Sequence, residues 1–141
     1  MSYPDQIPLH VINISAVIQK GDQYLLARRS SEDEQTPDIW FFPGGKVEME
    51  NGAGVIYETV VRESREEVGV EIEPNIQFLA DGAFVRQSGH HVVILYFHCQ
   101  WKSGEARPLD GHSEVSWRTK SDWLAEPSLP IYARQVLEKL P

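Results

Sequence analysis

Residues 41–70 read FFPGGKVEMENGAGVIYETVVRESREEVGV, and this stretch contains six glutamates. The part from 55 to 68 has no glycine or proline, so it predicts a helix. At 100° per residue, Glu63, Glu66 and Glu67 fall within about a third of the helix circumference. Like charges four residues apart cost a helix a few tenths of a kcal/mol, so local helix stability does not explain why these acids stand together.

The same helix has an apolar side and a defined end. Gly69 is a residue type that commonly follows a helix C-terminus. A solvated charged face is the ordinary interpretation of three acids on a helix. The alternative is a metal site, because Mg²⁺ prefers carboxylate oxygens and the glycine pair at 44–45 lets backbone groups approach an ion or a phosphate. The apolar stripe consists of Ile56, Tyr57, Val60, Val61 and Val68.

The composition is that of a folded domain. The chain has 141 residues, 41% apolar and 24% charged, and no repeat or linker divides it, so residues 1–141 are expected to form one domain. A net charge of -8 argues against a broad nucleic-acid surface, because phosphate binding needs cations. The single Cys99 cannot form an intramolecular disulfide, and we find neither a basic leader nor an apolar run of membrane-spanning length. A cytoplasmic location is therefore expected.

The remaining elements alternate irregularly between strands and helices. Residues 11–18 and 23–28 predict a hairpin around the turn KGD. An irregular order favours an α/β sandwich with a mixed sheet over a doubly wound parallel fold. The other predicted elements are a polar loop at 30–38, strands at 76–85, 90–101 and 114–117, a helix at 121–126 capped by Ser121, and a helix at 130–140.

The glycine pair and the acidic helix together form a recognisable motif. PGGKVE followed by RESREEVGV resembles the box of the Nudix hydrolase family: a glycine, five residues, a glutamate, seven residues and then R-E-U-x-E-E-x-G-U, with U aliphatic. The resemblance is closest to the MutT-like branch and extends loosely over the hairpin, its end LLARRS and the later HSEVSW. It implies a Nudix-like α/β/α sandwich with a mixed β-sheet and a loop-helix-loop catalytic motif. It also implies metal-dependent hydrolysis of a nucleoside diphosphate linked to another group.

Two departures from the box concern its first half and its centre. Between Gly45 and Arg62 stand three residues more than the box allows, and Gly54 occupies the place expected for the first glutamate. In the family that glutamate supports the arginine, so another acid is expected to replace it. Ser64 stands at an aliphatic position, where its hydroxyl can bond back to the carbonyl one turn earlier. The candidates for the displaced glutamate are Glu48, Glu50 and Glu58.

The resemblance assigns roles by position. Glu63 and Glu67 match direct ligands of Mg²⁺, for which Mn²⁺ is a compatible substitute. Glu66 is a further ligand or holds a metal-bound water, and the carbonyl of Gly44 completes the shell. Arg62 is expected to orient Glu63 and to reduce the repulsion among the acids. Such cations polarise a phosphoryl oxygen and lower the pKa of a bound water, so hydrolysis needs no covalent intermediate.

The general base is open among four residues. His112 lies five residues before Trp117 and resembles a histidine that some family members use as the base. Imidazole has a suitable intrinsic pKa for this task. A solvated loop histidine is an equally weighted alternative. The other candidates for the base are Asp110, Glu114 and Glu66.

Three further residues are candidates for binding the substrate. Arg28 and Arg29 end a strand near the expected phosphate region, where a guanidinium suits a phosphate, although either can be a plain surface residue. Trp40 can stack on a base, but aromatic residues that enter a core are commoner. The three histidines and Cys99 within residues 90–99 do not predict a zinc site, because strand alternation separates the same-face pairs by eight residues.

The leading hypothesis is a Mg²⁺-dependent pyrophosphohydrolase that converts a nucleoside triphosphate, including oxidised ones, to monophosphate and pyrophosphate. Hydrolysis of a nucleotide sugar or another nucleoside-diphosphate derivative is the close alternative, slightly favoured by the position of His112. A non-catalytic nucleotide sensor is motivated by the displaced first glutamate, and a purely structural domain is a further alternative. The expected partner is a nucleotide-type small molecule rather than a nucleic acid or a membrane, and a homodimer is compatible with the sequence.

Overall fold

A central strand organises the sheet in the computed structural model, which describes residues 7–48 and 51–141. Strand β1, Val11–Lys20, pairs with three other strands. One of them, β7, His91–Ser103, runs parallel to β1, whereas the other pairings in the described ranges are antiparallel. The sheet is therefore mixed, as predicted.

The other elements follow the predicted order. The hairpin of β1 with β2 is confirmed, and its turn contains Gly21 at a φ of 62°, which glycine adopts without strain. None of the helices in the described ranges is long and apolar enough to cross a bilayer. The strands are β2 Gln23–Arg29, β3 Trp40–Phe41, β4 Gly44–Lys46, β5 Glu71–Ile72, β6 Gln77–Val85 and β8 His112–Thr119, and the helices are α2 Val55–Val68, α3 Lys120–Leu124 and α4 Ile131–Glu138.

Two strands share one edge of β1. Strand β4 pairs along its first half, with Gly45 opposite Ile14, whereas β2 pairs at its far end, with Lys20 opposite Gln23. Only glycine fits at Gly44, because a Cβ there would collide with the backbone carbonyl of Ile14. The glycine pair is thus held against the centre of the sheet as a short strand, which the sequence did not predict.

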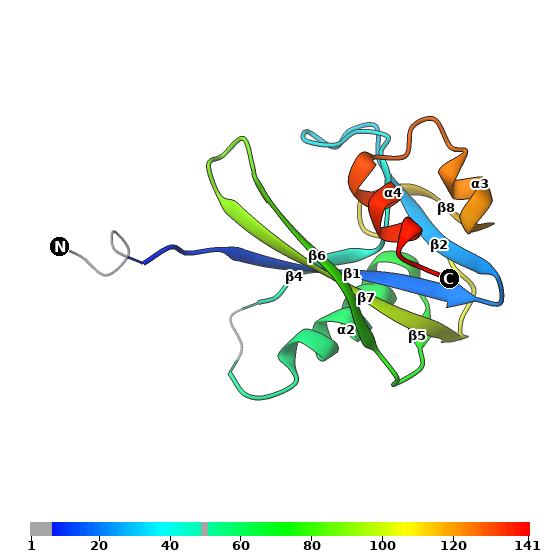
Figure 1. The fold of residues 1–141 in the computed structure, drawn as a ribbon, viewed down its shortest axis with the longest axis horizontal. Helices are drawn as coiled ribbons and strands as arrows, with labels where there is room; N and C mark the ends of the chain where they lie inside the picture. The colour runs from blue at the N-terminus through cyan, green and yellow to red at the C-terminus, as the bar shows by residue number, and fades with distance from the viewer. Residues whose placement is uncertain (1–6, 49–50) are drawn as a thin grey trace.

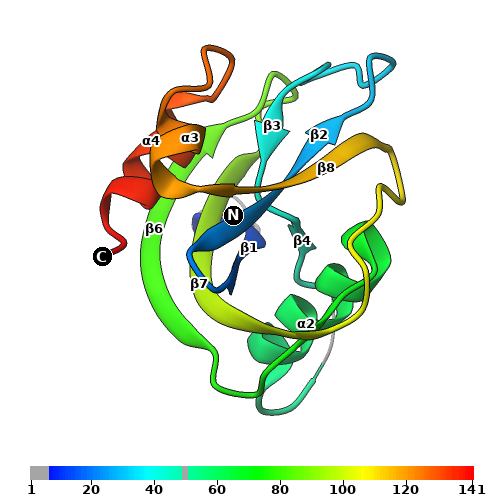
Figure 2. The same ribbon diagram turned by 90° about the vertical axis from the view of Figure 1, so that its right-hand side faces the viewer.

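Helices cover both faces of the sheet. Figures 1 and 2 show α2 on one side and α3 with α4 on the other. Alternate residues of β1 serve the two layers: Ile14 and Ile18 pack with Val60 of α2, whereas Val17 packs with Trp123 of α3. The structure is therefore an α/β/α sandwich, as the fold prediction stated.

Two details of the helices differ from the prediction. Helix α3 is capped by Thr119, whose Oγ1 accepts a hydrogen bond from the N–H of Asp122 at 3.2 Å, and not by Ser121. The correction follows from β8, which is longer than predicted and runs directly into the helix. Tyr57 was placed in the apolar stripe but is 49% exposed, with its ring edge-on to Phe97 at 5.6 Å.

Candidate active site

Helix α2 is fixed against the sheet by its apolar side. Val60 and Val68 are fully buried, and so is Ser64, whose hydroxyl donates to the carbonyl of Val60 at 2.8 Å, as predicted. The helix ends at Gly69 with a φ of 71°, a left-handed conformation that confirms the predicted stop. This packing turns Glu63 and Glu67 toward the glycine pair of β4.

Glu67 is the most enclosed acid of the cluster, with a side chain only 5% exposed. One carboxylate oxygen accepts a hydrogen bond from the N–H of Gly44 at 2.9 Å, and the other lies 3.2 Å from Nε2 of His112. Burial raises the pKa of Glu67 to about 7, although the Gly44 hydrogen bond and the charge of Arg29 act in the opposite direction. The negative charge of an ionised Glu67 is therefore only partly compensated in the free protein.

Glu63 lies directly over the second glycine. A Cβ on Gly45 would stand 2.5 Å from the carboxyl carbon of Glu63, so only glycine leaves room for this side chain. Burial, followed by the charge of Glu66, raises the pKa of Glu63, while Arg62 opposes both effects from 3.4 Å. Glu66 points toward solvent with a side chain 54% exposed, 4.0 Å from Arg62.

Arg62 connects the helix to the segment before it. Its guanidinium donates to the carbonyl of Lys46 at 3.3 Å and lies 3.7 Å from the carboxylate of Glu48. Glu48 therefore lies beside the arginine and stays a candidate for the displaced first glutamate. Another candidate, Glu50, lies outside the described residues.

The residues of this cluster fit a divalent cation. Glu63 and Glu67 are two largely buried carboxylates over a glycine cradle, and the pKa of each is raised because nothing there fully compensates a negative charge. Within residues 7–48 and 51–141, no three His, Cys, Asp or Glu side chains are grouped as a complete set of metal ligands. Gly44 faces the cluster with its N–H, so the carbonyl ligand stays a prediction.

His112 packs into the acidic cluster and not into solvent. Its side chain is 3% exposed, and its Nδ1 lies 2.9 Å from the carbonyl of Leu109. Since a carbonyl only accepts, Nδ1 donates in this contact, and Nε2 faces the carboxylate of Glu67 at 3.2 Å. Burial lowers the pKa of His112. Because its side chain is enclosed, the interpretation of His112 as a solvated loop residue is wrong. Asp110, another candidate for the base, lies near enough that its charge raises the pKa of Glu67.

The two arginines at the end of β2 have different surroundings. Arg28 forms an ion pair with Glu114 at 3.0 Å. This pair engages both side chains with each other and not with the acidic cluster. Arg29 lies opposite His112 in the pairing of β2 with β8. Its positive charge lowers the pKa of both His112 and Glu67. Of these two arginines, Arg29 is therefore the one on the side of the acidic cluster.

This geometry agrees with what the chain is similar to. The family model described as the NUDIX domain matches residues 9–140. The chain belongs to the Nudix family. A MutT-like protein of Streptomyces ambofaciens is 30% identical over 99% of this chain and 85% of its own length. The CTP pyrophosphohydrolase of Escherichia coli is 38% identical over 58 residues, which are 41% of this chain and 40% of that protein.

Solved structures agree with the Nudix assignment. The crystal structure of a MutT NUDIX hydrolase from Burkholderia pseudomallei has a TM-score of 0.78 at 26% identity, covering 94% of this chain and 99% of that one. The family and the MutT-like, Nudix-type sandwich predicted from the box are thus confirmed. The protein is a Nudix hydrolase, and this family acts on phosphoric anhydride bonds.

One predicted substrate contact of this Nudix hydrolase is wrong. Trp40 is only 3% exposed, and its ring centroid lies 5.2 Å from that of Trp123. The guanidinium of Arg118 lies 5.1 Å from the same ring. Trp40 therefore belongs to the core on the α4 side of the sheet and cannot stack on a nucleotide base.

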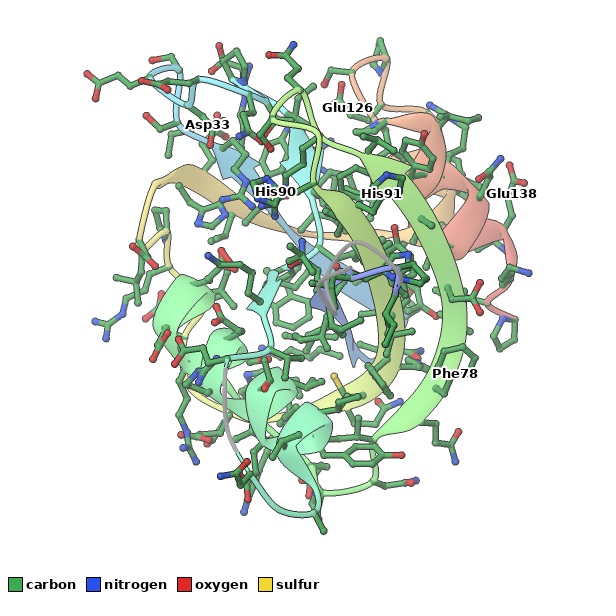
Figure 3. The ribbon with its side chains drawn as sticks, turned by 90° about the vertical axis from the view of Figure 1, so that its left-hand side faces the viewer. Asp33, Phe78, His90, His91, Glu126 and Glu138 are labelled. Carbon is green, nitrogen blue, oxygen red and sulfur yellow. The ribbon has the colours of Figure 1, made fainter. Side chains whose placement is uncertain are left out.

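The histidines of residues 90–99 and Cys99 lie at the start and along the length of β7. In the described part of the chain they join no group of metal ligands. His98 hydrogen-bonds to Gln19 at 2.7 Å, and burial raises the pKa of Cys99 to about 12. Figure 3 shows His90 and His91 where the chain enters β7 from the turn after β6.

A cavity of about 360 Å³ lies on the α4 side of the Nudix sheet and was not predicted. Figures 2 and 3 show the segments around it at one end of the sheet: the loop that carries Asp33, the turn between β6 and β7, and the start of α4. Arg29 lines this cavity, so it joins the cavity to the acidic cluster. The sequence feature that could have indicated this cavity is Asn13, a polar residue within an otherwise largely apolar strand. The lining includes Asn13, Arg29, Ile39, Phe41, Phe84, Arg86, Ile94, Tyr96 and Tyr132.

Proposed function

We propose that this Nudix hydrolase is a Mg²⁺-dependent pyrophosphohydrolase that cleaves a nucleoside triphosphate to a monophosphate and pyrophosphate. The observation that carries the proposal is the position of Arg29, which lines the cavity and whose charge acts on Glu67. A nucleoside in the cavity would direct its phosphates past Arg29 toward Glu63 and Glu67. The partial similarity to the CTP pyrophosphohydrolase supports a triphosphate as the substrate.

In this proposal, the acids of α2 hold the cation. Glu63 and Glu67 are the ligands, and Glu66 is a further ligand or holds a bound water. When bound, Mg²⁺ polarises a phosphoryl oxygen and neutralises the charge of the leaving pyrophosphate. Arg62 keeps the carboxylate of Glu63 over Gly45, and Arg29 binds a phosphate of the substrate.

Two residues manage protons in the proposed reaction. His112, whose Nε2 lies 3.2 Å from Glu67, accepts the proton of that carboxyl group, so that the carboxylate is ionised when it is needed as a ligand. Glu66 is the exposed carboxylate next to Glu63 and acts as the general base that accepts a proton from the attacking water. Asp110, whose charge acts on Glu63, is the second candidate for that base.

A substrate panel tests the proposal. Nucleoside triphosphates, an 8-oxo-purine triphosphate, a nucleotide sugar and ADP-ribose are incubated with Mg²⁺, and nucleotide products, phosphate and pyrophosphate are quantified. We expect equal amounts of monophosphate and pyrophosphate from at least one triphosphate, and no products when EDTA is present. Cleavage of the sugar or ADP-ribose compound with untouched triphosphates would replace the proposal by the derivative hydrolase. Tight nucleotide binding without turnover of any compound would identify a sensor.

A further inference from the structure

The cavity contains an acceptor that the protein does not satisfy. Oδ1 of Asn13 is buried and has no hydrogen-bond partner among the described residues. Asn13 lies in the middle of the sheet, opposite Ile94 of β7 and Lys46 of β4, and it lines the cavity. Buried polar atoms in folded proteins are almost always hydrogen-bonded, so an orphaned acceptor in a cavity wall indicates a missing partner.

The walls around Asn13 are suited to a flat aromatic ring. Most of the lining is aliphatic or aromatic, as in pockets that bind small organic ligands. Two of the aromatic lining residues, Phe84 and Tyr132, are 37% and 53% exposed, so their rings are open to an incoming ligand. The other apolar lining side chains are Ile39, Phe41, Ala83, Ile94, Pro130 and Tyr96.

The cations of the cavity define the orientation of a ligand. Arg29 and Arg86 both line it, and Arg29 lies opposite His112, whose Nε2 is 3.2 Å from the carboxylate of Glu67. A ligand with an anionic end would therefore extend its phosphates toward Arg29 and the acids. The neutral ring at its other end then occupies the part of the cavity that contains Asn13.

We propose that Asn13 is a specificity-determining residue that selects for a nucleobase, with its Oδ1 accepting a hydrogen bond from an N–H of the base. The amide of Asn13 also offers N–H donors, so it suits the edge of a base where a donor and an acceptor are adjacent. This assignment rests on the proposed function in taking a nucleotide as the ligand. It does not require that the nucleotide be hydrolysed.

A binding experiment in EDTA tests the role of Asn13 without turnover. Calorimetry measures the affinities of the four nucleoside 5′-monophosphates and of ribose 5-phosphate, which lacks the base, for the wild type and for Asn13→Leu. We expect Asn13→Leu to weaken the best-bound nucleotide by about tenfold or more, equivalent to about 1.4 kcal/mol, and to leave ribose 5-phosphate unchanged. The matched control is Asn75→Leu at an exposed asparagine between β5 and β6, which we expect to bind as the wild type does.

Thermal melting and NMR keep the test independent of folding defects. Asn13→Leu removes an unsatisfied buried acceptor, so its melting temperature should not fall below that of the wild type. In the wild type, the side-chain amide signal of Asn13 should shift on adding the nucleotide and stay in place on adding ribose 5-phosphate. A fixed amide signal, or an equal loss of affinity for both ligands, would overturn the role of Asn13.

The hydrolysis assay separates this inference from the proposed function. Base-dependent binding that is lost in Asn13→Leu, together with no hydrolysis of any triphosphate, would sustain the role of Asn13 and overturn the proposed activity. Hydrolysis of triphosphates with unchanged nucleotide affinity in Asn13→Leu would sustain the proposed activity and overturn the role of Asn13. No detectable nucleotide binding by the wild type would overturn the inference directly.

Discussion

Glu67 is both buried and the proposed ligand of a cation, and these two properties conflict in the free protein. Its carboxylate is buried and accepts a hydrogen bond from the N–H of Gly44, and burial raises the pKa of Glu67 to about 7. A cation ligand must be ionised, so in the proposed site the charge of this carboxylate is costly until an ion binds. The resemblance proposes Glu67 as a ligand from its place in the box, whereas its contact with His112 depends on the distant strand β8 and was not predictable.

Glu67→Gln should abolish catalysis without unfolding the protein. The amide oxygen can still accept from Gly44, but it is a poor ligand for Mg²⁺, so we expect triphosphate hydrolysis to fall roughly 10³-fold. Product formation under saturating Mg²⁺ is the measurement. Glu114→Gln serves as the control, because Glu114 pairs with Arg28 away from the cluster, and it should retain the wild-type rate. A Glu67→Gln variant that hydrolyses as fast as Glu114→Gln would contradict the assignment.

The two glycines of β4 should respond differently to alanine. In Gly45→Ala the new Cβ meets the flexible carboxylate of Glu63, so we expect a wild-type melting temperature and a 10- to 100-fold slower reaction, an order of magnitude typical for displaced ligands. In Gly44→Ala the Cβ meets the backbone carbonyl of Ile14, so we expect the melting temperature itself to fall. Equal activity and equal melting temperatures for both variants would contradict the separate roles assigned to Gly44 and Gly45.

Among elements, α2 was the most predictable and the strands around the site the least. Its periodic pattern and its Gly69 end are local properties, and its observed bounds are those predicted. Strand β4 consists of two glycines and a lysine, so its strand conformation comes from pairing with β1 rather than from propensity. Trp40 is buried for a similar reason, because Trp123 from far along the chain covers it.

The cap of α3 provides a stability test at the element scale. Thr119→Ala removes the hydroxyl that accepts from Asp122, so we expect the free energy of unfolding to fall by about 1 kcal/mol. Ser121→Ala is the matched control and should change it by less than about 0.5 kcal/mol, as is usual for exposed positions. Urea unfolding of both variants gives the comparison. A larger loss in Ser121→Ala would restore the original cap prediction.

In the whole molecule, the site forms where parts distant in sequence meet. The box residues could be predicted because α2 is contiguous. The cavity could not, because its lining comes from β1, the loop after β2, the β6–β7 turn and the start of α4, which only the folded sheet brings together (Figure 2). The sequence therefore predicted which acids stand together but not the cavity.

Stability should depend on pH through the buried acids. Because the folded pKa of Glu67 is raised to about 7, the folded state binds more protons than the unfolded state between about pH 4.5 and 7, so Glu67 lowers the stability as the pH rises through that window. The raised pKa of Glu63 acts in the same direction, whereas the lowered pKa of His112 acts oppositely below about pH 6.5.

Comparing the wild type with Glu67→Gln isolates the contribution of Glu67. Without metal, the melting temperature of the variant should exceed that of the wild type by an amount that grows from pH 5 to pH 8, equivalent to at most about 3 kcal/mol. Saturating Mg²⁺ should reduce this difference, because only the wild type gains stability from the ion. A difference that does not change with pH would show that Glu67 is ionised throughout.

The most direct test of the central claim, that the acids of α2 gather around a divalent cation, is a Mn²⁺ titration followed by electron paramagnetic resonance at pH 8. The wild type should bind Mn²⁺, Glu63→Gln and Glu67→Gln should each lose at least tenfold in affinity, and Glu114→Gln should bind as the wild type does. Unchanged Mn²⁺ binding by both Glu63→Gln and Glu67→Gln would contradict the account.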